Sequence, residues 1–250
     1  VMVVDLDRFR QINVSLGPAG ELRYPSYNYH DTGAGYPSRG ALQAYSPLAK
    51  ASLRSAIMAK YGTLAAVNAA WGTSLTSTNQ INPPDNAGLF FSSGAYKNIQ
   101  YGKDFIDWYN QSLITHGKTV LDAVSSALGT SFGSTPLGYK VPGVHWAINN
   151  PAYPRAAEVA AGLIQTSIDL NADATGHGYT KIVGLAKQIA TTRKVILHFT
   201  CLEMSNTPSA PDYSLAQDLV FWVAKHAGTL GVTIKGENAL AGGLATNAGW

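Results

Sequence analysis

The 250-residue chain is predicted to be an α/β protein, with a parallel sheet and helices packed outside it. Segments with the character of strands alternate along the chain with segments of helical periodicity. The strand segments are almost entirely apolar, as in parallel strands that are buried on both faces. Both a doubly wound sheet and a (β/α) barrel fit this alternation. No glycine-rich dinucleotide motif follows any strand, which weakens the nucleotide-binding version.

The N-terminal half begins with one predicted strand and continues into helices. Residues 12–16 (INVSL) are largely β-branched or apolar and are followed at once by Gly-Pro, which predicts a strand ending in a loop. A loop rich in tyrosine, glycine and proline continues to residue 40. Residues 41–62 and 63–72 have helical spacing, and each stretch ends at a glycine. After an irregular section, a long helix is predicted for residues 104–128.

The C-terminal half alternates more regularly between strands and helices. Strands are predicted at residues 139–146, 194–200 and 232–240, and helices at residues 181–193 and 214–231. The composition is globular, because 46% of the residues are hydrophobic and only 13% are charged. At 250 residues the chain is long enough to bury a sizeable core.

Charge and hydropathy exclude several classes of partner. The 18 basic residues are scattered among 15 acidic ones, so no nucleic-acid surface is predicted. No apolar run reaches the roughly eighteen residues that span a bilayer, so no membrane partner is predicted. The single cysteine, Cys201, excludes an intrachain disulfide and a multi-cysteine metal site. Both ends look like interior sequence, and we expect the chain to be a piece of a longer one.

Polar residues follow each predicted strand, where a plain core would not need them. In a parallel barrel the carboxyl ends of the strands form the active face. Three of the four glutamates of the chain lie at such ends, in different strand–helix units. The polar and aromatic residues at strand ends are Glu21, Arg23, His145, Trp146, Thr200, Glu203, Glu237 and Asn238, and Lys140 lies inside the second strand.

Two carboxyl groups from different strands that face one cleft are typical of a glycosidase. One carboxyl must be protonated to give a proton to the leaving oxygen, and the other must be ionised to activate water or to attack. Loops rich in tyrosine and tryptophan support this interpretation, because sugar rings stack on aromatic faces. The sequence therefore indicates a glycoside hydrolase.

Each of these residues also has a purely structural interpretation. Glu21 and Arg23 are equally compatible with a partly buried ion pair, and His145 with a donor to a backbone carbonyl. Lys140 lies within an apolar strand, where an unpaired ammonium is costly, so a carboxylate or a ligand is expected beside it.

Four other residues are expected to have no catalytic role. Cys201 is expected to be a small buried side chain. Glu158 lies in a helix-like stretch, and a structural role is expected for it. Asp104 and Asp107 are expected on a solvated helical face or in its first turn.

Four motifs, GPAGELRYPSY, GVHWAINNP, FTCLEM and GENAL, occur in this order. Together they closely resemble the β-amylase family of glycoside hydrolases, and YPSRGALQAYS and YGTLAAVNAAWGTSL are similar to its bacterial branch. The resemblance runs from about residue 12 to residue 240. It implies a (β/α)8 TIM barrel, of which residues 1–250 form a partial catalytic domain covering roughly the fourth to seventh βα units.

The resemblance also implies an activity and a set of roles. The implied activity is inverting exo-hydrolysis that releases β-maltose from the non-reducing ends of α-1,4-glucans such as starch. Such a mechanism places the two carboxyls roughly 6.5–9.5 Å apart, and the loop after Glu21 would shield this residue and raise its pKa. The implied roles are Glu21 as general acid, Glu237 as general base, and Lys140, His145, Thr200, Asn238 and Ala239 as substrate-binding residues.

Further expectations follow from the resemblance. No cofactor is expected, and the calcium site seen in bacterial relatives would lie outside this chain. Because polymeric starch is an extracellular substrate, a secreted protein is expected. Two alternatives stay open: a catalytically inactive fragment with weak glucan binding, and a barrel glycosidase that acts on another, β-linked glycan.

Overall fold

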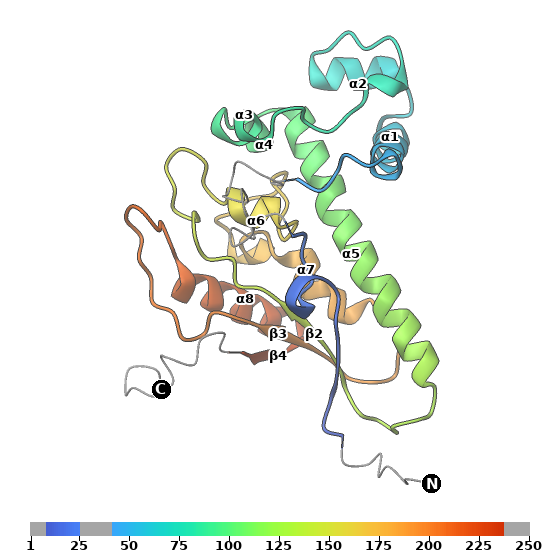
Figure 1. The fold of residues 1–250 in the computed structure, drawn as a ribbon, viewed down its shortest axis with the longest axis vertical. Coiled ribbons are helices and arrows are strands. Elements are labelled where there is room, and N and C mark those ends of the chain that lie inside the picture. The colour runs from blue at the N-terminus through green and yellow to red at the C-terminus, as the bar shows by residue number, and fades with distance from the viewer. Residues whose placement is uncertain (1–8, 26–41, 238–250) are drawn as a thin grey trace.

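A computed structural model describes residues 9–25 and 42–237, and within these ranges four strands form one parallel sheet (Figure 1). The strands are β1 (Ile12–Val14), β2 (Leu137–Val141), β3 (Val195–Phe199) and β4 (Thr233–Gly236), and they lie side by side in this order. Each pair of neighbours is parallel, with crossovers that carry helices. The predicted parallel α/β sheet is therefore confirmed.

The helices predicted at residues 41–62, 63–72, 104–128 and 214–231 are present with changed boundaries, whereas the helix predicted at 181–193 is reduced to a short helix and a 3₁₀ turn, and the strand predicted at 139–146 ends at residue 141. The α-helices in the described ranges are α1 (Pro47–Tyr61), α2 (Leu64–Trp71), α3 (Ala87–Ser92), α4 (Ala95–Asn98), α5 (Gln100–Leu128), α6 (Ala156–Ala160), α7 (Thr180–Gly184) and α8 (Ala216–Leu230). The first helix begins later than expected, because Pro47 occupies its first turn and the side chain of Ser46 caps it at the backbone N–H of Ala49. No described helix has the length and apolarity needed to cross a bilayer.

Short 3₁₀ turns connect these elements: η2 (Pro18–Gly20), η3 (Thr78–Gln80), η4 (Asp173–Gly178) and η5 (Leu185–Lys187). The sheet itself has two different faces. Leu137, Tyr139 and Val141 alternate along β2 with Gly138 and Lys140, and the first set is buried in the core. Lys140 pairs in register with His198, and His198 with Lys235, so the second face is polar.

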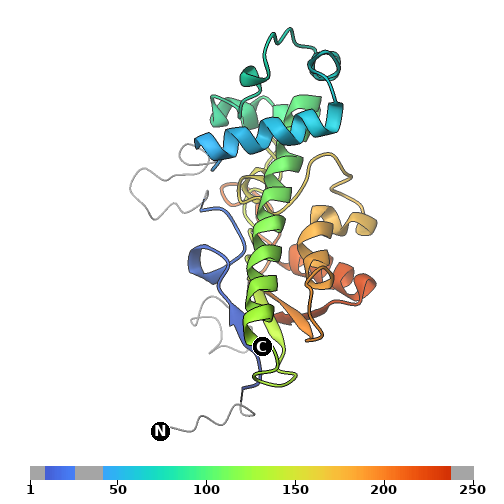
Figure 2. The same cartoon turned by 90° about the vertical axis from the view of Figure 1, so that its right-hand side faces the viewer.

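Helices α7 and α8 lie on one side of this sheet and the turn η2 on the other (Figure 2). Because one face of the sheet carries Lys140, His198 and Lys235, the prediction that the strands are apolar on both faces is wrong. A doubly wound sheet needs helices on both faces, whereas a barrel strand turns one face to its helices and the other to the barrel interior. The polar face of Lys140, His198 and Lys235 is the interior face of a barrel segment.

The long helix α5 carries a buried carboxylate near its start. The expectation that Asp104 is solvated is wrong, because this residue is only 2% exposed. Helices α1 and α2 pack over the start of α5, and the carboxylate accepts hydrogen bonds from Lys60, Tyr61, Trp71 and Gln100. Burial acts to raise the pKa of Asp104, and these hydrogen bonds outweigh it and lower the pKa. Asp107, one turn on, accepts hydrogen bonds from Gln165 and Ser167.

Glu158 in α6 has the structural role expected of it. Its side chain is fully buried and forms an ion pair with Arg155, and the hydroxyl of Tyr179 donates a further hydrogen bond of 2.8 Å. The guanidinium of Arg155 also donates to the carbonyl of His177 at 2.8 Å, so this pair joins α6 to the segment before α7. The buried group thus fixes the packing behind the sheet.

His226 gives the fold a dependence on pH. It is buried in α8, and burial lowers its pKa from the usual 6.5. The folded chain therefore favours the neutral ring, while the unfolded chain takes up a proton as the pH falls through about 6.5. This contribution to stability is complete above about pH 6.5 and is lost as the pH falls toward the lower, folded pKa.

A His226→Leu variant is expected to lose part of the acid sensitivity of the wild-type protein. Thermal unfolding of both proteins at about pH 8 and about pH 5 measures it. The decrease in Tm between the two pH values should be smaller in the variant, whatever its Tm at about pH 8. Equal decreases in the two proteins would show that His226 does not take up a proton on unfolding.

Candidate active site

Glu21 follows β1 and lies beside β2 at the carboxyl end of the sheet. The turn η2 follows Gly17, and the N–H of Gly20 donates to the carbonyl of Gly17 at 2.9 Å. The next residue, Leu22, is fully buried, and its N–H donates to the carbonyl of Lys140 at 2.8 Å. Glu21 thereby forms a short parallel bridge with Lys140. The GPAGE sequence fixes the carboxyl group at the end of the second strand.

The side chain of Glu21 accepts a hydrogen bond from the guanidinium of Arg23. The distance from Nε of Arg23 to Oε2 of Glu21 is 2.7 Å, and the side chains are 8% and 12% exposed, respectively. The structural interpretation of these residues as an ion pair is thus correct for the structure described here. Tyr24 anchors the segment, because its ring stacks on that of Tyr109 at 4.1 Å and its N–H donates to the carbonyl of Ala161. The carboxyl group of Glu21 is held in a defined orientation.

Gly17 gives the turn the space it needs. A Cβ atom at this position would lie 2.5 Å from the carbonyl oxygen of Glu21 and 3.0 Å from that of Arg23, both of them backbone atoms. Gly17→Ala is therefore expected to displace Glu21. On the expectation that Glu21 is the general acid, this should lower kcat of the full-length protein by about tenfold to a hundredfold, because small displacements of a reacting group are costly.

Gly184→Ala is the matched control, since no atom lies within 4 Å of a Cβ placed there and its backbone is helical. Steady-state kinetics on soluble starch, the substrate that the sequence resemblance implies, compares the two, with circular dichroism of each variant. Unchanged kcat in Gly17→Ala would show that the turn does not place a group that reacts.

Glu237 follows β4 and reaches Lys140 of β2 from the β4 side of the sheet, whereas Glu21 lies on the β1 side. The distance from Nζ of Lys140 to Oε1 of Glu237 is 3.0 Å, and these side chains are 25% and 43% exposed. The N–H of Glu237 donates to the carbonyl of Phe199, which ties the residue to the end of β3. The carboxylate expected beside Lys140 is present. Lys140 thus contacts Glu237 through its side chain and Glu21 through its backbone.

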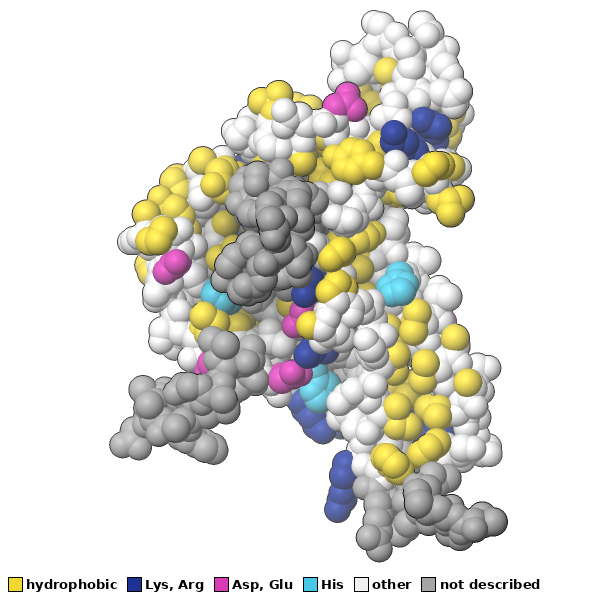
Figure 3. Space-filling view, viewed as in Figure 1, with side chains coloured by type: hydrophobic (Ala, Val, Ile, Leu, Met, Phe, Trp, Pro, Cys, Tyr) yellow, Lys and Arg dark blue, Asp and Glu magenta, His cyan; other side chains and the backbone are white. Residues whose placement is uncertain are grey.

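A cavity of about 320 Å³ opens at this point on the polar face. Lys140, His198 and Glu237 line it together with residues of the η2 turn and of the end of β1. Figure 3 shows charged and histidine side chains in a line through the middle of this face of the molecule. The cavity combines ionic, imidazole, amide and hydroxyl groups, which suits a ligand with many hydroxyl groups.

His198 is a cavity residue that the sequence did not indicate. Its ring nitrogen lies 2.5 Å from the amide nitrogen of Gln11, and it is the register partner of Lys140. Burial and the neighbouring Lys235 and Lys140 lower its pKa, while Glu237 opposes them. The ring is therefore favoured in its neutral form, in which one nitrogen donates and the other accepts. His198 lies within the apolar run KVILHFT, and only the register of β3 against β2 shows that it lies on the same face as Lys140.

His145 and Thr200 lie in the loops that follow β2 and β3. Nδ1 of His145 lies 2.7 Å from the hydroxyl of Ser214. The structural interpretation of His145 predicts a backbone carbonyl as its partner, whereas this partner is a side chain. Burial lowers the pKa of His145, against the opposing charges of Glu203 and Asp212. Thr200 is buried, and its hydroxyl accepts a hydrogen bond of 2.8 Å from the N–H of Gly143.

The remaining sequence predictions concern Cys201 and residues that lie outside the described ranges. Cys201 is buried, and burial raises the pKa of its thiol to about 12, which fits an inert structural side chain. Asn238, Ala239 and the loop of residues 26–41 lie outside the described residues. In the part of the chain that the structure does describe, no three His, Cys, Asp or Glu residues are grouped so as to hold a metal ion.

Comparison with known proteins gives a consistent result. The model of glycosyl hydrolase family 14 matches residues 8–247. The chain is 42% identical to a β-amylase of Cytobacillus firmus over 93% of its own length and 46% of that protein. It is also 34% identical to a β-amylase of Medicago sativa, over 92% of its own length and 42% of that protein.

A solved structure is similar over almost the whole chain. The crystal structure of the catalytic domain of β-amylase from Paenibacillus polymyxa superimposes with a TM-score of 0.79 at 41% identity. The match covers 96% of this chain and 52% of that one. The chain therefore spans about half of this solved domain and less than half of the curated relatives named above.

Proposed function

The chain belongs to glycosyl hydrolase family 14, the β-amylase family, and on that premise we propose that the full-length protein is an exo-acting hydrolase of α-1,4-glucans. The proposed product is β-maltose, released from non-reducing ends with inversion. The fold is a segment of the TIM barrel of this family, and we assign residues 1–250 to roughly its fourth to seventh βα units.

The observation that carries the proposal is the arrangement of Glu21 and Glu237 around Lys140. The two glutamates come from the ends of different strands: Glu237 contacts the lysine through its carboxylate, and Glu21 pairs with it through the backbone. In an inverting mechanism one carboxylic acid protonates the leaving oxygen while a carboxylate on the opposite side takes a proton from water. Glu21 is the proposed acid and the more exposed Glu237 the proposed base; Glu21 must then take up a proton and give up its ion pair with Arg23 before it acts.

The reaction proceeds in one step. Glu237 accepts a proton from a water molecule, and the water oxygen attacks the anomeric carbon of the sugar. The bond from this carbon to the glycosidic oxygen breaks, and that oxygen takes the proton of Glu21. Lys140 orients the carboxylate of Glu237 through the 3.0 Å contact, so that one oxygen faces the cavity.

We also propose Lys140, His145, Thr200, Asn238 and Ala239 as substrate-binding residues. Burial favours the neutral form of His145, which can both donate to and accept from sugar hydroxyls. The chemistry uses carboxyl groups alone and needs no cofactor. A secreted location is proposed with it, because starch is a polymer that does not enter cells.

The products that the full-length protein releases from debranched amylose test this function. Chromatography should show maltose accumulating from the start, with only a slow decrease in viscosity, since an exo-acting enzyme shortens each chain from one end. A mixture of longer oligosaccharides with a rapid decrease in viscosity would indicate internal cleavage and contradict the proposal. Release of sugar from β-linked glucans instead would support the alternative of a barrel glycosidase on another glycan.

A further inference from the structure

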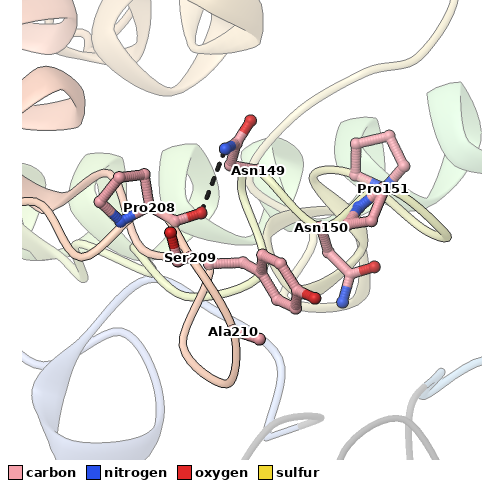
Figure 4. Close-up of a pocket in the computed structure, with 8 residues that line it drawn as sticks. Asn149, Asn150, Pro151, Pro208, Ser209 and Ala210 are labelled. Carbon is pink, nitrogen blue, oxygen red and sulfur yellow. Dashed lines mark hydrogen bonds between the residues drawn. The ribbon is translucent and has the colours of Figure 1, made fainter.

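A second cavity, of about 550 Å³, lies between the loop after β2 and the loop after β3 (Figure 4). We call it the outer groove. Asn150 and Pro151 lie on one side of it, and Pro208, Ser209 and Ala210 on the other. None of its lining residues belongs to the cavity around Glu237.

The outer groove is held in shape by contacts between the two loops. The N–H groups of Ala147 and Asn149 donate to the carbonyls of Asp212 and Tyr213, each at 3.1 Å. The side chain of Asn149 donates to the carbonyl of Pro208 at 3.2 Å, as the dashed line in Figure 4 marks. Ala147 and Tyr213 both have positive φ values, of 58° and 46°, which residues with a side chain rarely adopt. Such strain is kept where the surroundings determine the backbone, and it is common at binding sites.

The chemistry of the lining indicates an uncharged ligand. Amide groups of Asn149 and Asn150, the hydroxyl of Ser209 and the phenol of Tyr213 are combined with proline rings, and none of the lining residues is charged. Sugars offer hydroxyl groups to such donors and acceptors and C–H faces to such rings. An ionic ligand would find no counter-charge in this groove.

The loop that forms one side of the outer groove also contacts His145, a proposed substrate-binding residue. Ser214, next to Tyr213, contacts Nδ1 of His145, and the N–H of Leu215 donates to the carbonyl of His145 at 3.1 Å. His145 and the outer groove therefore belong to the same pair of loops, which places the groove on the side of the molecule where a longer sugar chain would leave His145.

We propose that the outer groove binds further glucose units of a long α-1,4-glucan, outside the cavity where cleavage takes place. The proposal rests on the proposed function for the class of substrate. Binding in the outer groove gives the protein a preference for long glucans over short oligosaccharides. Tyr213 and Asn150 then hold the polymer and take no part in the chemistry.

Two variants of the full-length protein test the groove. Tyr213→Ala removes the ring. Asn150→Asp keeps the oxygen that accepts from the N–H groups of Ala152 and Tyr153, but removes the amide donor and adds a charge. Ser126→Ala is the control, in a different cavity near the end of α5. Affinity electrophoresis in gels with soluble starch measures binding, and kinetics on soluble starch and on maltotetraose measures turnover.

Both groove variants are expected to bind starch about fivefold more weakly, with a matching rise in KM and unchanged kcat. Turnover of maltotetraose should stay as in the wild type. Equal losses on both substrates would mean that the variants disturb His145 and would overturn the proposal, as would unchanged starch binding. If the wild type hydrolyses neither substrate but Tyr213→Ala still weakens starch binding, the proposed function fails and the groove stands.

Discussion

Glu237→Gln and Glu21→Gln are each expected to abolish starch hydrolysis by the full-length protein, with losses in kcat of about a hundredfold to ten-thousandfold. The amide of glutamine has nearly the shape of the carboxyl group, but it neither gives a proton to the leaving oxygen nor takes one from water. Starch binding should persist in both variants, since the cavity keeps its size. Asp218→Asn is the control for the same carboxyl-to-amide change, because Asp218 lies in the first turn of α8 and has no role in the proposed chemistry.

The two roles can be separated with α-maltosyl fluoride, whose fluoride leaves without a proton. The Glu21→Gln variant is expected to hydrolyse this substrate at close to the wild-type rate, because the acid is not needed. The Glu237→Gln variant should stay inactive, because water still needs a base. Substantial starch hydrolysis by either variant would remove that glutamate from the chemistry, and the opposite pattern on the fluoride would exchange the two roles.

Glu158→Ala is expected to destabilise the fold by about 3–5 kcal/mol, because it leaves the guanidinium of Arg155 buried without its partner. The free energy of unfolding of a typical domain is about 5–15 kcal/mol, so this loss is a large share of it. Arg155 is 7% exposed and Glu158 is fully buried, and Nη2 of Arg155 donates to Oε1 of Glu158 at 2.9 Å. The hydroxyl of Tyr179 would lose its acceptor as well.

Denaturant unfolding of the wild type, of Glu158→Ala and of the double variant Arg155→Met/Glu158→Met measures this effect. The double variant removes both charges and is expected to be more stable than Glu158→Ala, since no buried charge remains without a partner. A double variant that is as unstable as Glu158→Ala would show that lost packing, and not the unpaired charge, accounts for the loss.

The sequence predicted the order of the main elements because each has a strong local signal. The run VILHF and the long amphipathic stretch of α5 differ in periodicity over many residues, and polar residues at the strand ends pointed to Glu21, Lys140 and Glu237. The short helices α3 and α4 were missed, because six and four residues carry too little periodicity to outweigh the neighbouring Pro, Asn and Gly residues.

Features that depend on contacts distant in sequence could not be predicted. Asp104 is buried because Lys60 and Trp71, from two earlier helices, reach its carboxylate. Likewise, His198 lies in the cavity because the register of β3 against β2 places it beside Lys140. Neither arrangement leaves a pattern within one segment, and both follow only from how the segments pack.

Proton NMR of the first maltose released from amylose by the full-length protein tests the central claim most directly. The proposed roles of Glu21 as acid and Glu237 as the base that activates water predict inversion, so the β-anomeric signal should increase first and the α signal should follow only by mutarotation. An α signal that increases first would show retention. It would contradict the assignment of Glu237 as the base that activates water.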